Sequence, residues 1–154
     1  MKEVYKGLYV GSEDDVPKAE DRGYAILSCC KDGKHSHRGL LGYESMGAPK
    51  GPEYLFARRK DHLFLNLIDG DNPDYVPDKL VNEALAFITE QLDKGKSVLV
   101  HCVEGKSRGP SIALLWLGLN GKISSLRLFR LLYPDYDPSP GIKLYTKARL
   151  AARR

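Results

Sequence analysis

Residues 98–111 read V-L-V-H-C-V-E-G-K-S-R-G-P-S. This stretch carries the strongest structural signal in the chain. The stretch begins with aliphatic residues, turns through small and polar ones, and continues into the apolar segment 112–119. This order predicts a buried strand, a tight loop and a helix. The backbone N–H groups of such a loop and the N-terminus of the helix converge on one point, where they favour an anion. The sequence therefore predicts a phosphate-sized anion site between strand and helix.

Two side chains give this anion site its expected chemistry. Cys102 ends the predicted strand, and Arg108 follows six residues later, where the loop curls back. The thiolate is the nucleophilic form of cysteine, and a helix N-terminus or a neighbouring guanidinium favours it. The guanidinium also presents a planar fork of donors that fits phosphate oxygens. The expected phosphate-binding residues are Val103, Glu104, Gly105, Lys106, Ser107 and Arg108.

The remaining sequence alternates strand patterns with helix patterns. Short apolar runs at residues 7–11, 24–28 and 62–68 read as strands, in addition to the run at 97–100. Helical patterns occupy residues 12–22, 77–95, 112–119, 124–132 and 142–152, and Gly95 ends the second of these helices. We therefore expect one α/β domain over residues 1–154, with a central, mostly parallel sheet of about 4–5 strands flanked by helices.

Residues 31–60 lack a sustained period and contain five glycines, so a long irregular loop is expected there. Its basic side chains either rim a site for an acidic substrate or keep the loop solvated, and the second interpretation is favoured. These side chains are Lys31, Lys34, Arg38, Arg58, Arg59 and Lys60.

Composition sets broad limits. The chain has 154 residues, a formal net charge of +4 and three cysteines. Three cysteines in a chain of this length do not form a disulfide framework, which favours a reduced, cytoplasmic setting. No apolar run reaches the length of a membrane span, and residues 1–10 lack the apolar core of a signal peptide. A monomer is expected, and nucleic acid is not the expected partner because the positive charge is mild.

The segment H-C-V-E-G-K-S-R fits a His-Cys-x5-Arg signature with a glycine three residues after the cysteine. In this it resembles the cysteine-dependent protein phosphatases, and the compact chain is similar to their dual-specificity branch. The opening G-L-Y-V-G-S and the pair L-A-F-I and V-L-V-H-C extend the likeness over residues 7–119.

The resemblance implies a role for each signature residue. Cys102 would be the nucleophile that forms a cysteinyl-phosphate, Arg108 would bind the phosphate, and His101 would be a buried organiser of the loop. It also implies that no metal and no cofactor are needed, and that the substrates are proteins phosphorylated on tyrosine and on serine or threonine.

A general acid is expected on the loop after residues 62–68. The family spacing falls on Asp71, 31 residues before Cys102, and D-N-P-D resembles the family's acid loop. Asp69 and Asp74 are rivals on the same turn, and any of the three could instead shape the turn or cap the next helix. Asp71 is the preferred assignment.

One position departs from the family pattern. The residue after the arginine is usually Ser or Thr, whose hydroxyl bonds to the cysteine sulfur, but here it is Gly109. Either Ser111 or Ser107 compensates, or hydrolysis of the cysteinyl-phosphate is slow.

Other functions compete with this one. Lys106 suits highly charged substrates such as phosphoinositides or RNA 5′ ends, and Gly109 leaves open a phosphate-binding module with little turnover. The sequence Gly105-Lys106-Ser107 lacks the earlier glycine of a nucleotide-binding loop. Cys29, Cys30, His35 and His37 are metal-ligand types without a recognised zinc spacing, so no metal site is expected.

Overall fold

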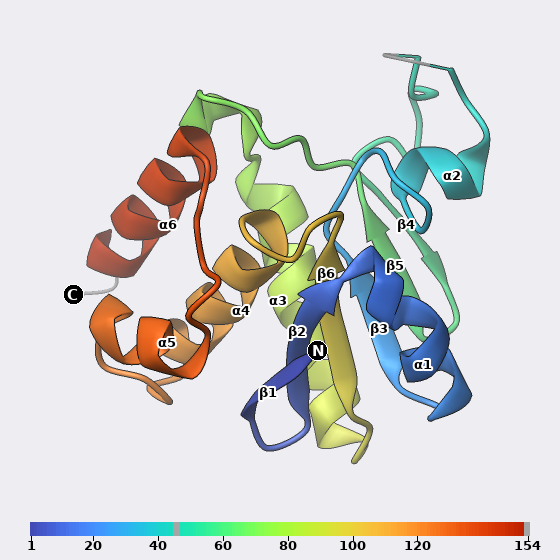
Figure 1. Cartoon of the computed structure of the whole chain (residues 1–154). Coiled ribbons are helices and arrows are strands. Elements are labelled where there is room, and N and C mark those ends of the chain that lie inside the picture. The colour runs from blue at the N-terminus through green and yellow to red at the C-terminus, as the bar shows by residue number, and fades with distance from the viewer. Residues whose placement is uncertain (45–46, 153–154) are drawn as a thin grey trace.

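The structure is a computed structural model that describes residues 1–44 and 47–152. Its centre is a six-stranded sheet in the order β1-β2-β6-β3-β5-β4, with helices on both faces (Figure 1). The strands are β1 (Lys2–Tyr5), β2 (Leu8–Ser12), β3 (Ala25–Ser28), β4 (Phe56–Arg59), β5 (His62–Leu65) and β6 (Val98–Cys102). The helices are α1 (Val16–Asp21), α2 (His37–Leu41), α3 (Asp78–Asp93), α4 (Arg108–Leu119), α5 (Leu126–Leu132) and α6 (Pro140–Ala152), with short 3₁₀ turns η1 (Glu13–Asp15) and η2 (Pro73–Tyr75).

The four inner strands are the ones that the apolar runs predict, and they are mutually parallel. β6 pairs with β2 on one side and β3 on the other, and β3 pairs with β5. The α/β class and the mostly parallel sheet are thus confirmed. The estimate of 4–5 strands was too low, because β1 and β4 add an antiparallel strand at each edge. Their sequences, K-E-V-Y and F-A-R-R, are mostly exposed and lack the apolar run of a buried strand.

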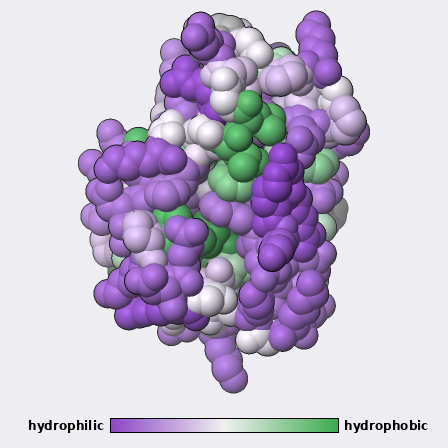
Figure 2. All heavy atoms as spheres, turned by 90° about the vertical axis from the view of Figure 1, so that its right-hand side faces the viewer, coloured by the Kyte–Doolittle hydropathy of each residue, from purple (hydrophilic) through white to green (hydrophobic). Residues whose placement is uncertain are grey.

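Alternate residues of β6 serve two different faces of the sheet. Val100 and Cys102 belong to the large core that also contains buried residues of α3 and α4. Leu99 instead joins a small cluster with Val16 and Ala19 of α1. Figure 2 views the molecule from the right-hand side of Figure 1, where α1 lies, and its surface there is mostly hydrophilic with hydrophobic residues gathered in the middle.

Local chemistry explains where the helices around the site begin and end. Ser12 and Asp15 form a capping box that starts η1 directly after β2. Gly95, with φ +79°, ends the turn after α3 and leads into β6. The Ser125 side chain accepts from Leu128 N and starts α5. None of the helices in residues 1–44 and 47–152 is both long and apolar enough to cross a membrane.

The segment of residues 31–60 is more ordered than its sequence suggests. It contains α2 and β4, so the expectation of a wholly irregular loop was wrong. Ser36 caps α2 by accepting from Gly39 N, and Gly42 ends it with φ +76°. His37 is buried and bonds through Nδ1 to Tyr43 Oη and through Nε2 to Glu53 O. These tertiary bonds stabilise a short helix that local propensity alone would not predict.

Candidate active site

The signature stretch forms the strand, loop and helix that its sequence predicts. Cys102 is the last residue of β6 and is 2% exposed, while Arg108 is the first residue of α4. Residues 103–107 connect them in a tight loop at the carboxyl end of the parallel strands. This edge of an open α/β sheet is where ligands commonly bind.

Three carbonyl groups of the loop accept hydrogen bonds from the surrounding segments. Glu13 N donates to Val103 O at 3.2 Å, Tyr133 Oη to Gly105 O at 2.6 Å, and Asp137 N to Lys106 O at 2.8 Å. Over the described part of the chain, none of the N–H groups of residues 103–108 donates to a protein acceptor. The loop therefore presents a set of free donors, which is the arrangement that binds an anion.

Gly105 is needed for this geometry on two grounds. Its φ is +76°, a conformation that glycine adopts without strain. A Cβ at this position would also lie 2.9 Å from the backbone C and O of Gly11 on β2. Any side chain here would push the loop away from β2.

Arg108, at the end of the signature loop, has a side-chain donor without a protein partner. Its Nη1 donates to Leu67 O at 2.9 Å, which holds the guanidinium in position. Its Nε is buried and has no hydrogen-bond partner in residues 1–44 and 47–152. Because an unpaired buried donor is costly, an anion that accepts from Nε would relieve this cost.

These groups line a cavity of about 430 Å³. Its lining residues are Asp69, Cys102, Val103, Glu104, Lys106, Ser107, Arg108, Asp137 and Ser139. Most of the expected phosphate-binding residues are thus brought together around Cys102. Gly105 is the exception, since it packs on β2. Asp71 and Asp74 are also not among the lining residues.

A chain of hydrogen bonds crosses the sheet beneath the loop. Ser28 Oγ on β3 lies 2.6 Å from Nε2 of His101 on β6 and 2.7 Å from Nε2 of His62 on β5. Nδ1 of His101 lies 3.2 Å from the carbonyl oxygen of Cys102. The sequence predicts a role for His101 but not for Ser28 or His62. A single polar residue at a strand end gives no sign of the residue that it contacts on a neighbouring strand.

The direction of every bond in this chain follows from its last acceptor. A carbonyl oxygen only accepts, so His101 Nδ1 carries a proton and donates to Cys102 O. Burial lowers the pKa of His101 to about 4, so the ring is neutral and its Nε2 accepts from Ser28. Ser28 Oγ then accepts from Nε2–H of His62, whose pKa is lowered to about 3, again chiefly by burial. One tautomer of each histidine thus satisfies all three hydrogen bonds of the chain.

The loop that follows β5 is tied to the signature loop through Ser107. Ser107 Oγ donates to Asp69 Oδ1 at 2.8 Å and accepts from Ser139 N at 2.9 Å. Gly141 N donates to Gly70 O at 3.0 Å, which joins the same loop to α6. Asp69 therefore contacts the cavity directly. Asp71 lies two residues farther along, exposed to solvent.

The structure gives a physical reason for Gly109. A Cβ there would lie 3.0 Å from the carbonyl carbon of His101 and 3.2 Å from Cys102 N, so α4 packs closely on β6. The two hydroxyls that could have compensated have other partners. Ser111 Oγ is buried and bonded to Tyr136 Oη at 2.7 Å, and Ser107 Oγ joins Asp69 to Ser139.

Of the four alternative metal ligands, the thiols of Cys29 and Cys30 and the ring of His37 have hydrogen-bond partners within the fold. His37 uses both ring nitrogens within the fold, and burial raises the pKa of the Cys29 thiol well above its usual value and that of Cys30 to about 12. In the described ranges, no three His, Cys, Asp or Glu side chains gather as a metal site would require.

The basic residues of positions 31–60 are largely paired away from the cavity. Lys34, Arg38, Arg58 and Arg59 form ion pairs with Asp14, Asp32, Glu90 and Glu53. Lys31 is buried with its ammonium 5.7 Å from the centre of the Tyr43 ring. None of them lines the cavity. The favoured interpretation of a solvated basic loop fits the exposed, ion-paired residues but not the buried Lys31.

Two curated proteins match part of the chain. A stretch of 75 residues, 49% of this chain, is 36% identical to Dual specificity protein phosphatase YVH1 of Plasmodium falciparum. A stretch of 56 residues, 36% of this chain, is 38% identical to Dual specificity protein phosphatase PHS1 of Arabidopsis thaliana. These matches cover only 13% and 6% of the two relatives, so the chain spans a small part of their length. No protein-family model matches the chain.

Solved structures share the fold over nearly the whole chain. DUSP15 has a TM-score of 0.69 at 18% identity and covers 100% of this chain and 90% of its own. The human tyrosine phosphatase-like serine/threonine/tyrosine-interacting protein has a TM-score of 0.66 at 18% identity, covering 99% and 96%. Human DUSP28 has a TM-score of 0.67 at 17% identity, with the same coverage. Part of this chain is thus similar in sequence to dual-specificity protein phosphatases, and the whole of it shares the fold of solved dual-specificity phosphatase structures.

Proposed function

We propose that this chain hydrolyses phosphomonoesters on protein side chains, namely phosphotyrosine and phosphoserine or phosphothreonine, through a cysteinyl-phosphate and without a metal. The observation that carries the proposal is the set of unpaired donors around Cys102. The loop N–H groups and the buried Nε of Arg108 lack protein acceptors over the described residues, and all lie beside one thiol. A phosphoryl group supplies the acceptor oxygens that these donors lack.

In the first step, the Cys102 thiolate attacks phosphorus. An S–P bond forms, and the P–O bond to the leaving group breaks. The loop N–H groups and Arg108 bind the equatorial oxygens as charge spreads over them. A carboxylic acid gives its proton to the leaving oxygen, and Asp71 is assigned this role.

In the second step, water attacks phosphorus while the same carboxylate takes a proton from it. The S–P bond breaks, which releases inorganic phosphate and restores the thiolate. The hydrogen bond of Ser107 to Asp69 supports this assignment indirectly, because it holds the acid loop against the signature loop. Asp69, which lines the cavity, remains the rival acid.

The charges around the cavity favour a protein substrate over a highly charged one. Lys106 and Arg108 are the lining cations, and three carboxylates, Asp69, Glu104 and Asp137, lie beside them. A phosphoinositide or an RNA 5′ end brings several phosphates, which these carboxylates would repel. A side chain with one phosphoryl group avoids this repulsion.

Hydrolysis of para-nitrophenyl phosphate tests the proposal. Turnover should be lost in Cys102→Ser, be inhibited by vanadate and persist in a chelator of divalent metals. Turnover rates on phosphotyrosine peptide, phosphoserine peptide, phosphoinositide and RNA 5′ phosphate then rank the substrates. Faster turnover of phosphoinositide or RNA would reject the protein-substrate assignment, and tight phosphate binding without turnover would indicate a binding module.

A further inference from the structure

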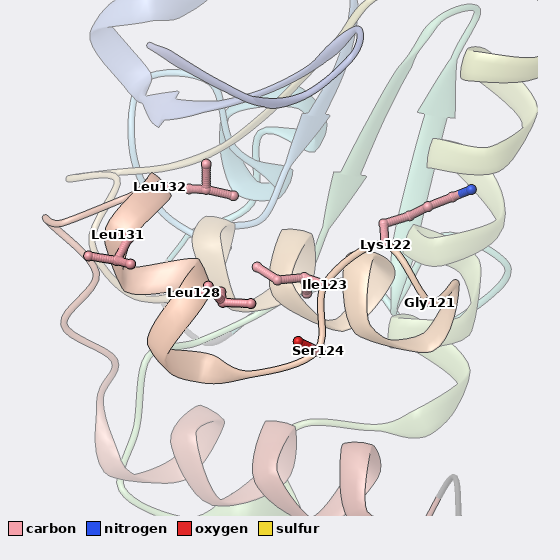
Figure 3. A pocket seen from close by; sticks show the side chains of 7 residues that line it. All are labelled: Gly121, Lys122, Ile123, Ser124, Leu128, Leu131 and Leu132. Atoms are coloured by element: carbon pink, nitrogen blue, oxygen red, sulfur yellow. The ribbon is translucent and has the colours of Figure 1, made fainter.

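A second cavity lies away from Cys102, beside α5. It has a volume of about 810 Å³ and is lined by Gly121, Lys122, Ile123, Ser124, Leu128, Leu131 and Leu132 (Figure 3). One wall is the turn between α4 and α5, and the other is α5 itself. In Figure 3 the side chains of Ile123 and Leu128 lie close to each other at its floor, while Lys122 extends away from the leucines. We call this feature the α5 groove.

Most of the leucines of α5 are exposed to solvent, which is unusual for an amphipathic surface helix. Phe129 is its one buried residue, whereas Leu128 is 44% exposed and Leu131 72% exposed. Leu126 and Leu132, at the two ends of α5, are 45% and 38% exposed. An amphipathic helix normally turns such residues inward, and contiguous exposed apolar residues commonly mark a protein interface.

The turn before α5 and α5 itself carry only positive charges. Between Lys106 and Pro134 the sequence contains no Asp or Glu. Lys122, Arg127 and Arg130 are exposed, and within the described ranges none of them forms an ion pair. Lys122 lies over the Tyr5 ring, and Arg130 donates to Tyr136 O and lies over the Tyr136 ring, so their positive charges are held in place without a carboxylate. The surface therefore combines leucines with unpaired positive charge.

We propose that the α5 groove binds an amphipathic helix of a partner protein, with leucine-like side chains on one face and carboxylates flanking them. Apolar anchors at helical spacing would fill the space between Ile123 and Leu131, and the carboxylates would face Arg127 and Arg130. A second copy of this chain fits less well, because a two-fold contact would oppose Arg127 and Arg130 with the same cations.

The position of the α5 groove relates it to the catalytic cavity. α5 ends at Leu132, and the next residue, Tyr133, donates to Gly105 O of the signature loop. Asp137 and Ser139, a few residues later, line the cavity itself. A partner bound along α5 would thus lie beside the segment that borders the cavity.

A phage-displayed library of helical peptides with randomised surface positions, selected against the full chain, tests the proposal. Selected peptides should place Leu, Ile or Phe at i, i+3 or i+4 and i+7, with Asp or Glu beside them. Their affinity should fall at least about tenfold in Leu131→Glu and fall with rising salt. The matched control is Leu144→Glu on α6, where Leu144 is 52% exposed but lies outside the groove, and affinity should be unchanged.

Several results would overturn the proposal. Recovery of basic peptides, or equal loss of affinity in both variants, would place binding elsewhere. Concentration-dependent dimerisation that Leu131→Glu abolishes would assign the groove to a second copy. Binding to vesicles of anionic phospholipid, lost in Leu131→Glu while no peptide is selected, would assign it to a membrane surface. None of these readouts depends on phosphatase activity.

Discussion

Ser28 Oγ lies 2.6 Å from Nε2 of His101, and this bond joins β3 to the residue that precedes the nucleophile. Because His101 donates its other N–H to the carbonyl of Cys102, Ser28 acts on Cys102 through one intermediate ring. The contact holds His101 in the tautomer that donates to the Cys102 carbonyl. Ser28 and His101 are thus positioning residues in the proposed mechanism.

Replacing Ser28 by Ala should therefore impair both stability and reactivity. The change leaves Nε2 of His101 and Nε2 of His62 without partners, which should lower the free energy of unfolding by about 1–3 kcal/mol. Because the end of β6 then loses the bond from Ser28 that positions His101, the rate of Cys102 alkylation by iodoacetate should change at every pH measured.

A matched control separates positioning from general destabilisation. Thr89→Val breaks the bond between Trp116 Nε1 and Thr89 Oγ1, which no residue of the cavity shares. This variant should lose stability with an unchanged alkylation profile. If Ser28→Ala also leaves the profile unchanged, Ser28 has only a structural role.

Acid should destabilise the fold through the two histidines of this chain. Their pKa values, about 3 for His62 and about 4 for His101, lie below the ordinary value of 6.5. The unfolded chain therefore binds more protons below about pH 6.5, and stability falls as the pH drops from there toward the folded values. The loss should reach a few kcal/mol near about pH 4.5, at about 1.4 kcal/mol per unit of pKa shift.

Urea unfolding between neutral and acid pH measures this loss. His62→Gln removes one titrating group and keeps a side-chain N–H that can donate to Ser28, so its stability should depend less steeply on pH than that of the wild type. Identical slopes for the two proteins would show that His62 does not titrate on unfolding.

The two candidate acids make opposite predictions. Asp71→Asn removes the proton donor proposed for the leaving group and should lower kcat about 10²–10⁴-fold. Asp69→Asn keeps an amide oxygen that can accept from Ser107, so the loop stays anchored and the loss should be much smaller. Steady-state kinetics with a phosphotyrosine peptide compares them. Equal losses, or a larger loss in Asp69→Asn, would transfer the role to Asp69.

Slow hydrolysis of the cysteinyl-phosphate should produce a burst. At Gly109 no hydroxyl is available to the cysteine sulfur, and the hydroxyls of Ser107 and Ser111 bond to Asp69 and Tyr136 instead. Stopped-flow measurement with para-nitrophenyl phosphate should thus show rapid release of about one equivalent of nitrophenol before the steady state. A time course that is linear from the start would mean that the first step limits turnover.

Much of the fold could be predicted because its inner strands carry local signals. The runs at Ala25–Ser28 and Val98–Cys102 are buried throughout, and their apolar character is visible in the sequence. β1 and β4 were missed because edge strands are half exposed and owe their structure to a neighbour. α2 was missed because tertiary bonds of His37 stabilise it.

In the candidate site, too, the local features could be predicted from the sequence and the tertiary contacts could not. The residues of the signature loop are adjacent in sequence, so the pattern of the chain alone predicts the roles of Cys102 and Arg108. Ser28 is 73 residues from His101, and Tyr133 is 28 residues from Gly105, so only the folded chain brings these partners together. No spacing rule identifies a hydroxyl group that is so far away in the sequence from its partner.

Trapping the phosphorylated enzyme tests the central claim most directly. Rapid quenching during turnover of a ³²P-labelled phosphotyrosine peptide should yield label bound to the chain, and peptide mapping should locate it on Cys102. The label should be absent in Cys102→Ser, and it should accumulate in the wild type because its hydrolysis is slow. Turnover that persists in Cys102→Ser, or label found on another residue, would contradict the account.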